Sequence, residues 1–184
     1  MLDYVNWVGA RVRRAGKELR VWSDGMEGSS KVRLDPRTVV QWWENRASAP
    51  PAELVKRGHR VLNSGWWPLY FVTGGPLENL RAGVDDMYEQ WEPRRFEGPY
   101  NSRWFSDGPV VPAPQFLDAN EPRQLGATVN VWNDDPGNMS EGQIAAGIAP
   151  RLRVLAQKTW ASPQLTSSYA EFAKRTAPVS PSGP

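Results

Sequence analysis

The sequence predicts an α/β fold in which helices cover a parallel sheet. Short segments rich in apolar residues alternate with amphipathic segments of helical spacing, which is the pattern of such folds. Spacers of about 10 to 20 residues between the apolar segments leave room for a helix in most connections. With 184 residues, 40% of them hydrophobic and 23% charged, the chain is expected to form one globular domain.

The first part of the chain predicts a helix and then a strand. Residues 2–15 carry apolar side chains from Leu2 to Val12 at helical spacing, with arginines between them, and Gly16 ends the helix. Residues 18–22 (ELRVW) are a short apolar run that leads into the turn sequence Ser-Asp-Gly. This pair is the first structural unit.

Two further strands and a short helix follow. Residues 38–43 (TVVQWW) predict a second buried strand, and a proline-rich bend comes after it. Pro51 suits the start of a helix over 52–57, because its missing N–H is not needed there. Residues 60–62 (RVL) predict the third strand, which ends in Asn-Ser-Gly.

The remaining segments alternate in the same way. Residues 92–123 are rich in proline and glycine and lack a period, so we interpret them as one long functional loop. The tail is expected to be disordered over 177–184, which leaves 1–176 as the folded part. We expect helices over 78–91, 141–160 and 167–175, and a fourth strand over 127–132 (ATVNVW).

Composition excludes several classes of function. The chain has no cysteine and one histidine, His59, which excludes thiol catalysis, disulfides and any site built on two imidazoles. The net charge is only +2, and no run of Lys or Arg exceeds two residues, so nucleic acid is not an expected partner. No apolar stretch has the roughly 20 residues of a membrane helix, so no membrane partner is expected either. We expect no cofactor and no metal.

Aromatic and acidic residues recur at the ends of the predicted strands. The chain has ten tryptophans, several times the ordinary usage. In parallel α/β folds the carboxyl ends of the strands carry the site. The residues concerned are Trp22 with Asp24, Trp43 with Glu44, Trp132 with Asp134, and Trp66, Trp67 and Tyr70 after the third strand.

Tryptophans and carboxylates together suit a sugar, whose flat apolar faces stack on aromatic rings while its hydroxyls need polar partners. The structural alternative is that each of these tryptophans belongs to the core. Because all four strand ends share the pattern, we favour a common sugar site.

Four segments resemble glycoside hydrolase family 20, the β-N-acetylhexosaminidases and their lacto-N-biosidase relatives. They are VWSDGM (21–26), VVQWWEN (39–45), RVLNSGWWPLYFV (60–72) and LGATVNVWNDD (125–135), in the order in which the family has them. Residues 141–163 also resemble the last barrel helix of the family. The resemblance covers roughly residues 2–163 and implies the C-terminal half of a (β/α)₈ barrel, about strands 5 to 8 with their helices.

The resemblance implies a substrate-assisted, retaining glycosidase. In this family the 2-acetamido oxygen of the substrate attacks the anomeric carbon, an Asp orients the acetamido group, and the adjacent Glu is the general acid. Tryptophans surround the N-acetyl group and a tyrosine binds its carbonyl oxygen. The implied substrate is a glycan that contains N-acetylhexosamine.

Carried over by position, Trp22, Trp43 and Trp132 match the pocket tryptophans, and Tyr70 matches the tyrosine that binds the acetamido oxygen. Trp42, the neighbour of Trp43, is expected to face the barrel wall instead of the pocket. We also expect Trp67 to contact substrate.

Three positions bear on the sugar hydroxyls. Asp134 falls where many members have a glutamate that binds hydroxyl groups, and its shorter side chain is a departure. Val72 stands where many members have an aspartate for the outer hydroxyls, so recognition of O4 and O6 is open. Asp24 is assigned either to substrate binding or to capping of the turn after its strand.

The catalytic Asp-Glu pair of the family is absent, because the 184 residues contain no Asp-Glu dipeptide. In the family the pair precedes the helix that begins here at residue 2. We therefore expect a truncated or split enzyme that is inactive alone, and whose partner would be a missing N-terminal half or a second copy at the open sheet edges. The alternative is a non-catalytic carbohydrate-binding protein. Any secretion signal would lie upstream of Met1, so the sequence predicts no compartment.

Other motifs are expected to be structural. Asp85 and Asp86 lie in a helix and predict a solvated face, and NDDPGN (133–138) predicts a turn and not a calcium loop. His59 is expected to have a surface or capping role.

Overall fold

The computed structural model describes residues 1–25, 32–44, 49–74, 83–97, 114–160 and 162–177. The chain folds into two compact units, each built from two stretches of sequence. Unit 1 comprises Met1–Trp67 and Arg94–Thr128, and unit 2 comprises Pro68–Pro93 and Val129–Pro184. The predicted tail lies outside the described residues, apart from Ala177.

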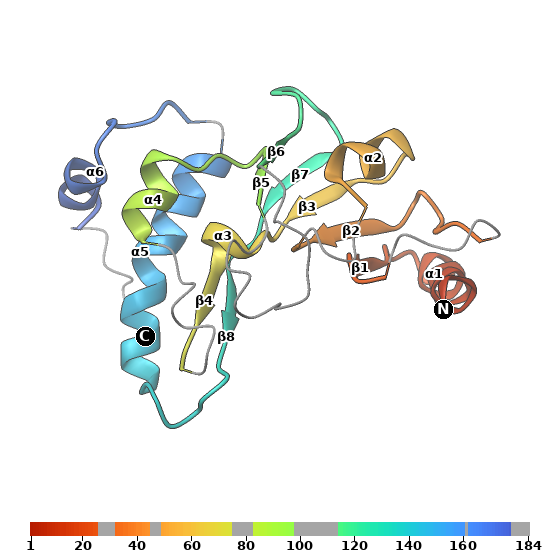
Figure 1. The fold of residues 1–184 in the computed structure, drawn as a ribbon, viewed down its shortest axis with the longest axis horizontal. Helices are drawn as coiled ribbons and strands as arrows, with labels where there is room; N and C mark the ends of the chain where they lie inside the picture. Colours follow the sequence, from red (N-terminus) through yellow and green to blue (C-terminus); the bar gives the residue numbers. More distant parts are fainter. Residues whose placement is uncertain (26–31, 45–48, 75–82, 98–113, 161, 178–184) are drawn as a thin grey trace. The chain divides into compact units, whose positions relative to one another are not determined.

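Unit 1 contains a parallel sheet of four strands in the order β1-β2-β3-β7 (Figure 1). The register pairs Val21 with Val40 and Gln41 with Leu62, so consecutive strands lie side by side with their carboxyl ends at the same edge. β2 and β3 are buried along their whole length, as the central strands of a sheet with two covered faces are. The strands are β1 (Arg20–Trp22), β2 (Val39–Trp42), β3 (Val61–Asn63) and β7 (Gln124–Ala127).

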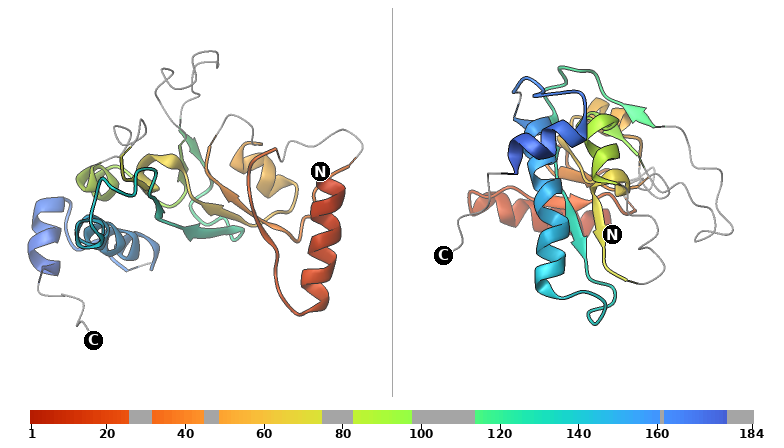
Figure 2. Two further views of the ribbon diagram at one scale, coloured as in Figure 1. Left: turned by 90° about the horizontal axis from the view of Figure 1, so that it is seen from below. Right: turned by 90° about the vertical axis from the view of Figure 1, so that its left-hand side faces the viewer.

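The helices of unit 1 are α1 (Leu2–Arg14) and α2 (Pro51–Lys56), and Figure 2 shows α1 beside the start of the sheet. α1 carries its basic residues in the last turn, where they interact favourably with the helix dipole. A short antiparallel pair, β5 (Arg95–Phe96) with β6 (Gln115–Phe116), completes the unit. The core is formed by Leu2, Leu34, Val40, Trp42, Ala49, Leu54, Val61, Phe96 and Leu117.

Unit 2 pairs β4 (Tyr70–Val72) in parallel with β8 (Asn130–Trp132). Three helices accompany the strands, and α4 contacts both of the others. They are α4 (Val84–Glu89), α5 (Glu141–Thr159) and α6 (Tyr169–Thr176), seen together in the right-hand view of Figure 2.

α5 begins with a complete capping box. The Ser140 hydroxyl accepts from the backbone N–H of Gln143, and the Gln143 side chain accepts from the backbone N–H of Ser140. These two bonds satisfy donors that would otherwise lack partners at the helix start. The long helix therefore begins at a residue that the sequence itself specifies.

Two aromatic contacts hold unit 2 together. Gly147 of α5 lies against Phe71 of β4, so closely that a Cβ at this glycine would lie 2.5 Å from the phenyl ring. Tyr88 of α4 stacks on Phe172 of α6, with ring centroids 4.5 Å apart. The Tyr88 hydroxyl also donates a 2.6 Å hydrogen bond to the carbonyl oxygen of Thr166.

The predicted parallel α/β class is confirmed, and the expected helices and the first three expected strands are present with shifted boundaries. The predicted helix over 78–91 corresponds to α4, which begins at Val84 after its N-cap Gly83 and ends at Glu89, and residues 78–82 of the prediction lie outside the described residues. Within the described helices, none has the length and apolar character needed to cross a membrane.

Three local predictions are wrong. The segment over 127–132 is not one strand, because β7 ends at Ala127 beside β3 and β8 begins at Asn130 beside β4. The stretch 92–123 is not without regular structure, since it contains β5 and β6. β4 and the short helix α3 (Trp66–Leu69) were not expected, because WWPLYFV lacks both a period and a turn signal.

Candidate functional site

A hydrogen bond joins the ends of β1 and β2 in unit 1. The indole N–H of Trp43 donates to Asp24 Oδ2 at 2.8 Å, and the backbone N–H of Trp43 donates to the Ser23 hydroxyl at 3.3 Å. Asp24 is exposed and Trp43 is half-buried, so this carboxylate fixes the orientation of an indole ring that stays partly open to solvent. Trp22, at the end of β1, is also half-buried.

Trp42 and Trp43 have opposite surroundings, although they are neighbours in the sequence. Trp42 is fully buried in the core of unit 1 and meets Phe96 edge to face, with centroids 5.5 Å apart. Trp43 lies 6.2 Å from the Trp66 ring, at the carboxyl end of the sheet. The alternation of side chains along a strand therefore assigns Trp42 to the core and leaves Trp43 as the candidate for binding.

Asn63 organises the turn that follows β3. Its side chain donates to the carbonyl oxygen of Arg95 at 2.7 Å and accepts from the N–H of Gly65 at 2.9 Å. Its carbonyl oxygen accepts from the N–H of Thr128. A Cβ at Gly65 would lie 2.9 Å from the Glu97 carbonyl oxygen, so only glycine allows this close approach.

An ion pair that the sequence did not single out lies next to this turn. Arg95 Nε donates to Glu97 Oε2 at 2.8 Å, and the Arg95 guanidinium carbon lies 4.7 Å from the centre of the Trp67 ring. Burial raises the pKa of the Glu97 carboxyl, and the positive charge of Arg95 opposes that shift. Both residues belong to the stretch interpreted as a functional loop, but no spacing in the sequence connects them to Trp67.

Unit 2 holds a second aromatic group. The Tyr70 and Trp132 rings lie 5.6 Å apart at an angle of 43°. Tyr70 is buried, whereas Trp132 is 40% exposed, which is unusual for so large an apolar ring. The pair therefore presents one aromatic face to solvent and holds it with a buried tyrosine.

Polar contacts fix the segment that follows Trp132. The Thr73 N–H donates to the Trp132 carbonyl oxygen at 2.8 Å, and the Thr73 hydroxyl donates to Asn133 Oδ1 at 2.5 Å. Asp134 is exposed at the next position. Asp135 caps a turn by accepting from the N–H of Gly137, which confirms the turn predicted for 133–138.

The other singled-out residues are structural. The expected surface position of His59 is wrong, because its side chain is buried. His59 precedes β3, and its Nδ1–H donates to the carbonyl oxygen of Thr38, just before β2, at 3.0 Å. Burial lowers the pKa of His59 and so favours the neutral ring. Asp85 and Asp86 lie in the first turn of α4, where carboxylates are favourable. Glu44 is buried at the end of β2.

Neither unit shows a metal-binding arrangement in its described residues, since nowhere do three His, Asp or Glu side chains gather. The chemical groups that the two units present at these positions are aromatic rings, amides and single carboxylates. Such groups bind neutral polar ligands with apolar faces.

Residues 2–163 match the sequence pattern of the family described as "Glycosyl hydrolase family 20, catalytic domain". The chain belongs to this family. The match includes residues of both units, among them Trp22, Trp43, Tyr70 and Trp132.

Two curated relatives agree with this assignment. The family-20 chain is 26% identical over 157 residues to the lacto-N-biosidase of Bifidobacterium bifidum, covering 85% of the chain and 12% of that protein. It is also 26% identical to the β-N-acetylhexosaminidase of Cellulomonas fimi, covering 96% of the chain and 32% of that protein. The chain thus spans less than a third of the length of each of these relatives.

Solved structures support the fold. The family-20 chain matches Dispersin B with a TM-score of 0.68 and 18% identity, over 87% of the chain and 48% of that structure. It matches the β-N-acetylhexosaminidase of Bacteroides fragilis with a TM-score of 0.62 and 19% identity, over 94% of the chain and 32% of that structure.

Proposed function

We propose that this chain is part of a glycosidase that removes N-acetylhexosamine residues from glycans by substrate-assisted, retaining catalysis. The chain supplies aromatic residues that bind the sugar. It does not supply the acid, because the Asp-Glu pair of the family is missing from its 184 residues. The family assignment and the names of the two curated relatives support this class of substrate.

The Tyr70–Trp132 pair is the observation that carries the proposal. A half-exposed indole held against a buried tyrosine offers a flat apolar surface next to a phenol group, which suits the methyl and carbonyl groups of an N-acetyl substituent. In the proposed role Trp132 stacks on the acetamido group and the Tyr70 hydroxyl donates to its oxygen. Such a bond stabilises the acetamido group in the orientation needed for attack on the anomeric carbon.

Unit 1 has aromatic residues of its own that are proposed to bind sugar. The Asp24 carboxylate orients the Trp43 indole through a 2.8 Å hydrogen bond, and Trp22 ends the neighbouring strand. This geometry supports a role for Asp24 in substrate binding through its hold on Trp43. Trp67, with Arg95 over its ring, is proposed as a further contact.

Specificity for the outer hydroxyls differs from that of many members of the family. Val72 is 1% exposed within β4 and has no polar group to offer a sugar. Asp134 is exposed, and we propose that its carboxylate accepts hydrogen bonds from sugar hydroxyls. The chain is therefore expected to tolerate variation at O4 more readily than members with an aspartate at the Val72 position.

We also propose that the chain is the C-terminal half of a (β/α)₈ barrel. The parallel order β1-β2-β3, with each strand beside the next in sequence, is what consecutive barrel strands require. Strand β1 lies at one edge of the described sheet, where a further strand could pair with it.

Replacement of one exposed tryptophan tests the binding role. Trp132→Ala is expected to weaken the binding of N-acetylglucosamine by about tenfold, because it removes the stacking surface. Trp160→Ala is the matched control, since Trp160 is 81% exposed in the same unit and is assigned no role. Isothermal titration calorimetry measures both variants; equal losses, or no loss in Trp132→Ala, would contradict the proposal.

A non-catalytic carbohydrate-binding protein is the second candidate, favoured by the missing Asp-Glu pair alone. Both candidates require sugar binding, and they differ in whether another segment supplies the acid. The DNA that precedes the Met1 codon distinguishes them. An Asp-Glu dipeptide encoded in frame a few tens of codons upstream would support the glycosidase candidate. Its absence would support the carbohydrate-binding candidate.

A further inference from the structure

Unit 1 contains a pocket at the edge of its sheet opposite to the edge where Trp22 and Trp43 lie. Its volume is about 580 Å³, within the range of small-molecule sites. Arg13 lies in the last turn of α1, and the other lining residues come shortly before β1, β2, β3 or β7, so the pocket lies at the amino ends of the strands. All of them belong to unit 1.

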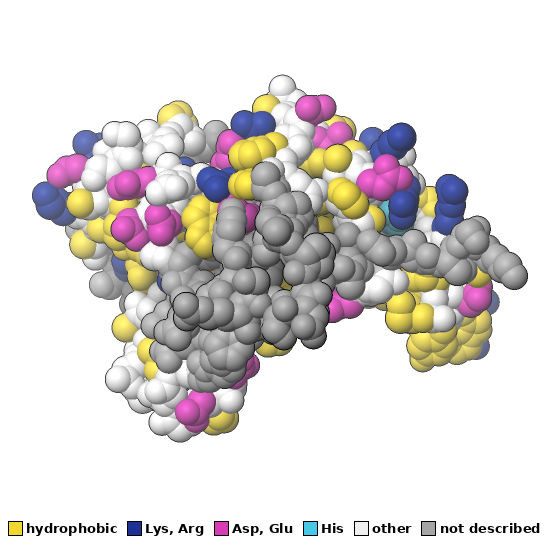
Figure 3. All heavy atoms as spheres, viewed as in Figure 1, with side chains coloured by type: hydrophobic (Ala, Val, Ile, Leu, Met, Phe, Trp, Pro, Cys, Tyr) yellow, Lys and Arg dark blue, Asp and Glu magenta, His cyan; other side chains and the backbone are white. Residues whose placement is uncertain are grey.

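The lining of this pocket is strongly basic. Five cationic side chains and one carboxylate contribute to it: Arg13, Lys17, Arg37, Arg60, Arg123 and Glu18. No aromatic residue lines it within the described part of the chain, so it does not offer the stacking surface that a neutral sugar requires. Lys and Arg side chains also gather at the surface over α2 (Figure 3).

Ion pairs leave part of this positive charge uncompensated. Asp35 is shared by two guanidinium groups, those of Arg13 at 2.8 Å and Arg37 at 2.7 Å. Glu18 pairs with Arg60. One carboxylate for two cations leaves an excess of positive charge on the Asp35 side of the pocket.

The remaining two cations are the least compensated. Arg123 lies 3.9 Å from Glu121, at the limit of an ion pair, and its side chain is 49% exposed. Lys17 has no ion-pair partner among the described residues and is exposed. These two side chains are therefore available to an incoming anion.

The walls of the pocket are stiff. Pro36 and Pro122 line it, and proline fixes the backbone angle φ. Gly58 has a φ of +94°, and a Cβ at this position would lie 3.3 Å from the Pro36 side chain. The backbone at these positions loses little conformational entropy when a ligand binds.

We propose that this pocket binds a tetrahedral oxyanion, a phosphate or sulfate group, either free or as an ester on a sugar. Arginine is the predominant cation, and its planar fork of N–H groups matches such oxygens. The site is separate from the proposed sugar-binding residues and does not depend on the proposed function. A monosaccharide that carries such a group fills the volume of the pocket better than the free ion does.

The test uses the full chain, with binding measured calorimetrically at fixed ionic strength. The probes are inorganic phosphate, glucose 6-phosphate and glucose. The variant is Lys17→Gln combined with Arg123→Gln, since both side chains are exposed and their loss is expected to leave the fold intact. The control variants are Arg14→Gln, which removes one exposed charge from α1 outside the pocket lining, and Arg14→Gln with Lys174→Gln, which matches the double loss of charge.

We expect both phosphate probes to bind, glucose not to bind, and the pocket variant to weaken phosphate binding about fivefold or more. Tighter binding of glucose 6-phosphate than of phosphate identifies the ester as the preferred form, equal binding means that the phosphate group alone is recognised, and weaker binding identifies the free anion. The proposal is overturned if phosphate fails to bind at millimolar concentration, or if the charge-matched control variant loses as much affinity as the pocket variant. Circular dichroism and thermal melting confirm that each variant is folded.

Discussion

Asp35 shows how much one side chain can connect. Its carboxylate accepts hydrogen bonds from Arg13 Nη2 and from three N–H groups of Arg37, and its backbone N–H donates to Asn6 Oδ1 of α1. The hydrogen bond from Arg37 lowers the pKa of this carboxyl from 3.8 to about 2, and the charge of Arg13 adds to the effect. One residue thus joins the end of α1 to the segment that leads into β2.

We predict that Asp35→Asn destabilises the protein by about 1 kcal/mol at pH 7, a value reduced for the solvent around this side chain. Because the folded pKa lies below the unfolded one, the contribution of Asp35 is complete above about pH 4 and is lost as the pH falls towards 2. Urea unfolding at pH 7, 4 and 2.5 measures this. The difference in free energy of unfolding between wild type and variant is expected to decrease as the pH falls.

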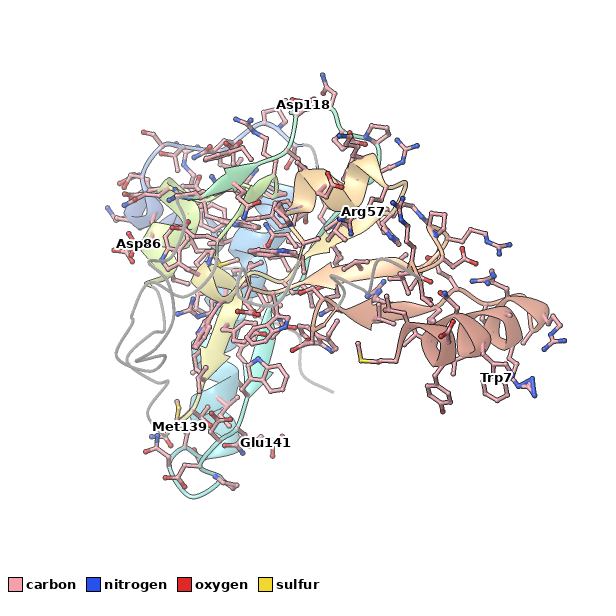
Figure 4. All side chains as sticks on the ribbon, turned by 45° about the vertical axis from the view of Figure 1, so that its right-hand side comes forward. Trp7, Arg57, Asp86, Asp118, Met139 and Glu141 are labelled. Atoms are coloured by element: carbon pink, nitrogen blue, oxygen red, sulfur yellow. The ribbon has the colours of Figure 1, made fainter. Side chains whose placement is uncertain are left out.

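Asp118→Asn is the control for this prediction. Asp118 is exposed on the loop before β7 and points away from the rest of unit 1 (Figure 4). The Asp118→Asn substitution is expected to change the free energy of unfolding very little at any of these pH values. A constant difference between Asp35→Asn and wild type from pH 7 to 2.5 would contradict the assigned role of the ion pairs.

At the scale of elements, the contact of α5 with β4 depends on the absence of a side chain. A Cβ at Gly147 would overlap the buried Phe71 ring, which is 3% exposed and cannot move aside easily. We predict that Gly147→Val destabilises unit 2 by about 2 to 3 kcal/mol, the usual effect of forcing extra volume into a packed core. Thermal unfolding followed by circular dichroism measures this.

The same helix provides the matched control. Gly142 has open space where its Cβ would lie, so Gly142→Ala is expected to raise stability by about 0.5 to 1 kcal/mol through helix propensity. Destabilisation by both substitutions to the same extent would mean that contact with Phe71 does not determine the effect at Gly147.

Elements with a strong local pattern could be predicted from the sequence. α1 and α5 follow the helical spacing of their apolar residues, and β2 and β3 are continuous apolar runs. β4 could not be found this way, because its pairing with β8 depends on residues about 60 positions away. The split of 127–132 between two sheets has the same origin, since nothing local requires the chain to change partners.

The candidate site residues also divide into those that a local pattern predicts and those that depend on distant parts of the chain. Trp43 and Trp132 were predicted from their places at strand ends, and the two units hold each of them partly exposed with a defined neighbour. Arg95 and Glu97 were missed, because their relation to Trp67 arises from the hydrogen bond between Asn63 and the Arg95 carbonyl. The pocket of unit 1 was missed as well, since its cations come from four separate segments.

The surface of α1 shows why exposure alone does not identify a sugar site. Trp7 is 51% exposed, stacks on Tyr4 and has Arg11 over its ring, and it points outward from the helix (Figure 4). Among the described residues, the ring contacts of Trp7 are all with side chains of α1, and no carboxylate orients its indole. Trp43 and Trp132 differ because residues on neighbouring strands hold them.

For the whole molecule, we predict that the chain binds sugar but does not hydrolyse it. The chain belongs to a glycosidase family but has no Asp-Glu pair in its sequence. We therefore expect the purified chain not to release the aryl group from an aryl N-acetylglucosaminide, even at micromolar protein and over hours. Measurable turnover that persists in Tyr70→Phe and Trp132→Ala would show a contaminating enzyme, and turnover abolished by those changes would contradict the proposed division of roles.

The most direct test of the central claim is a calorimetric titration of the 184-residue chain with N-acetylglucosamine and, in parallel, with glucose. The two sugars share their ring, and the acetamido group is the feature that the aromatic residues are proposed to bind. We predict millimolar or tighter binding of N-acetylglucosamine and binding of glucose at least about tenfold weaker. Equal affinities for the two sugars, or no binding of N-acetylglucosamine at millimolar concentration, would contradict the account.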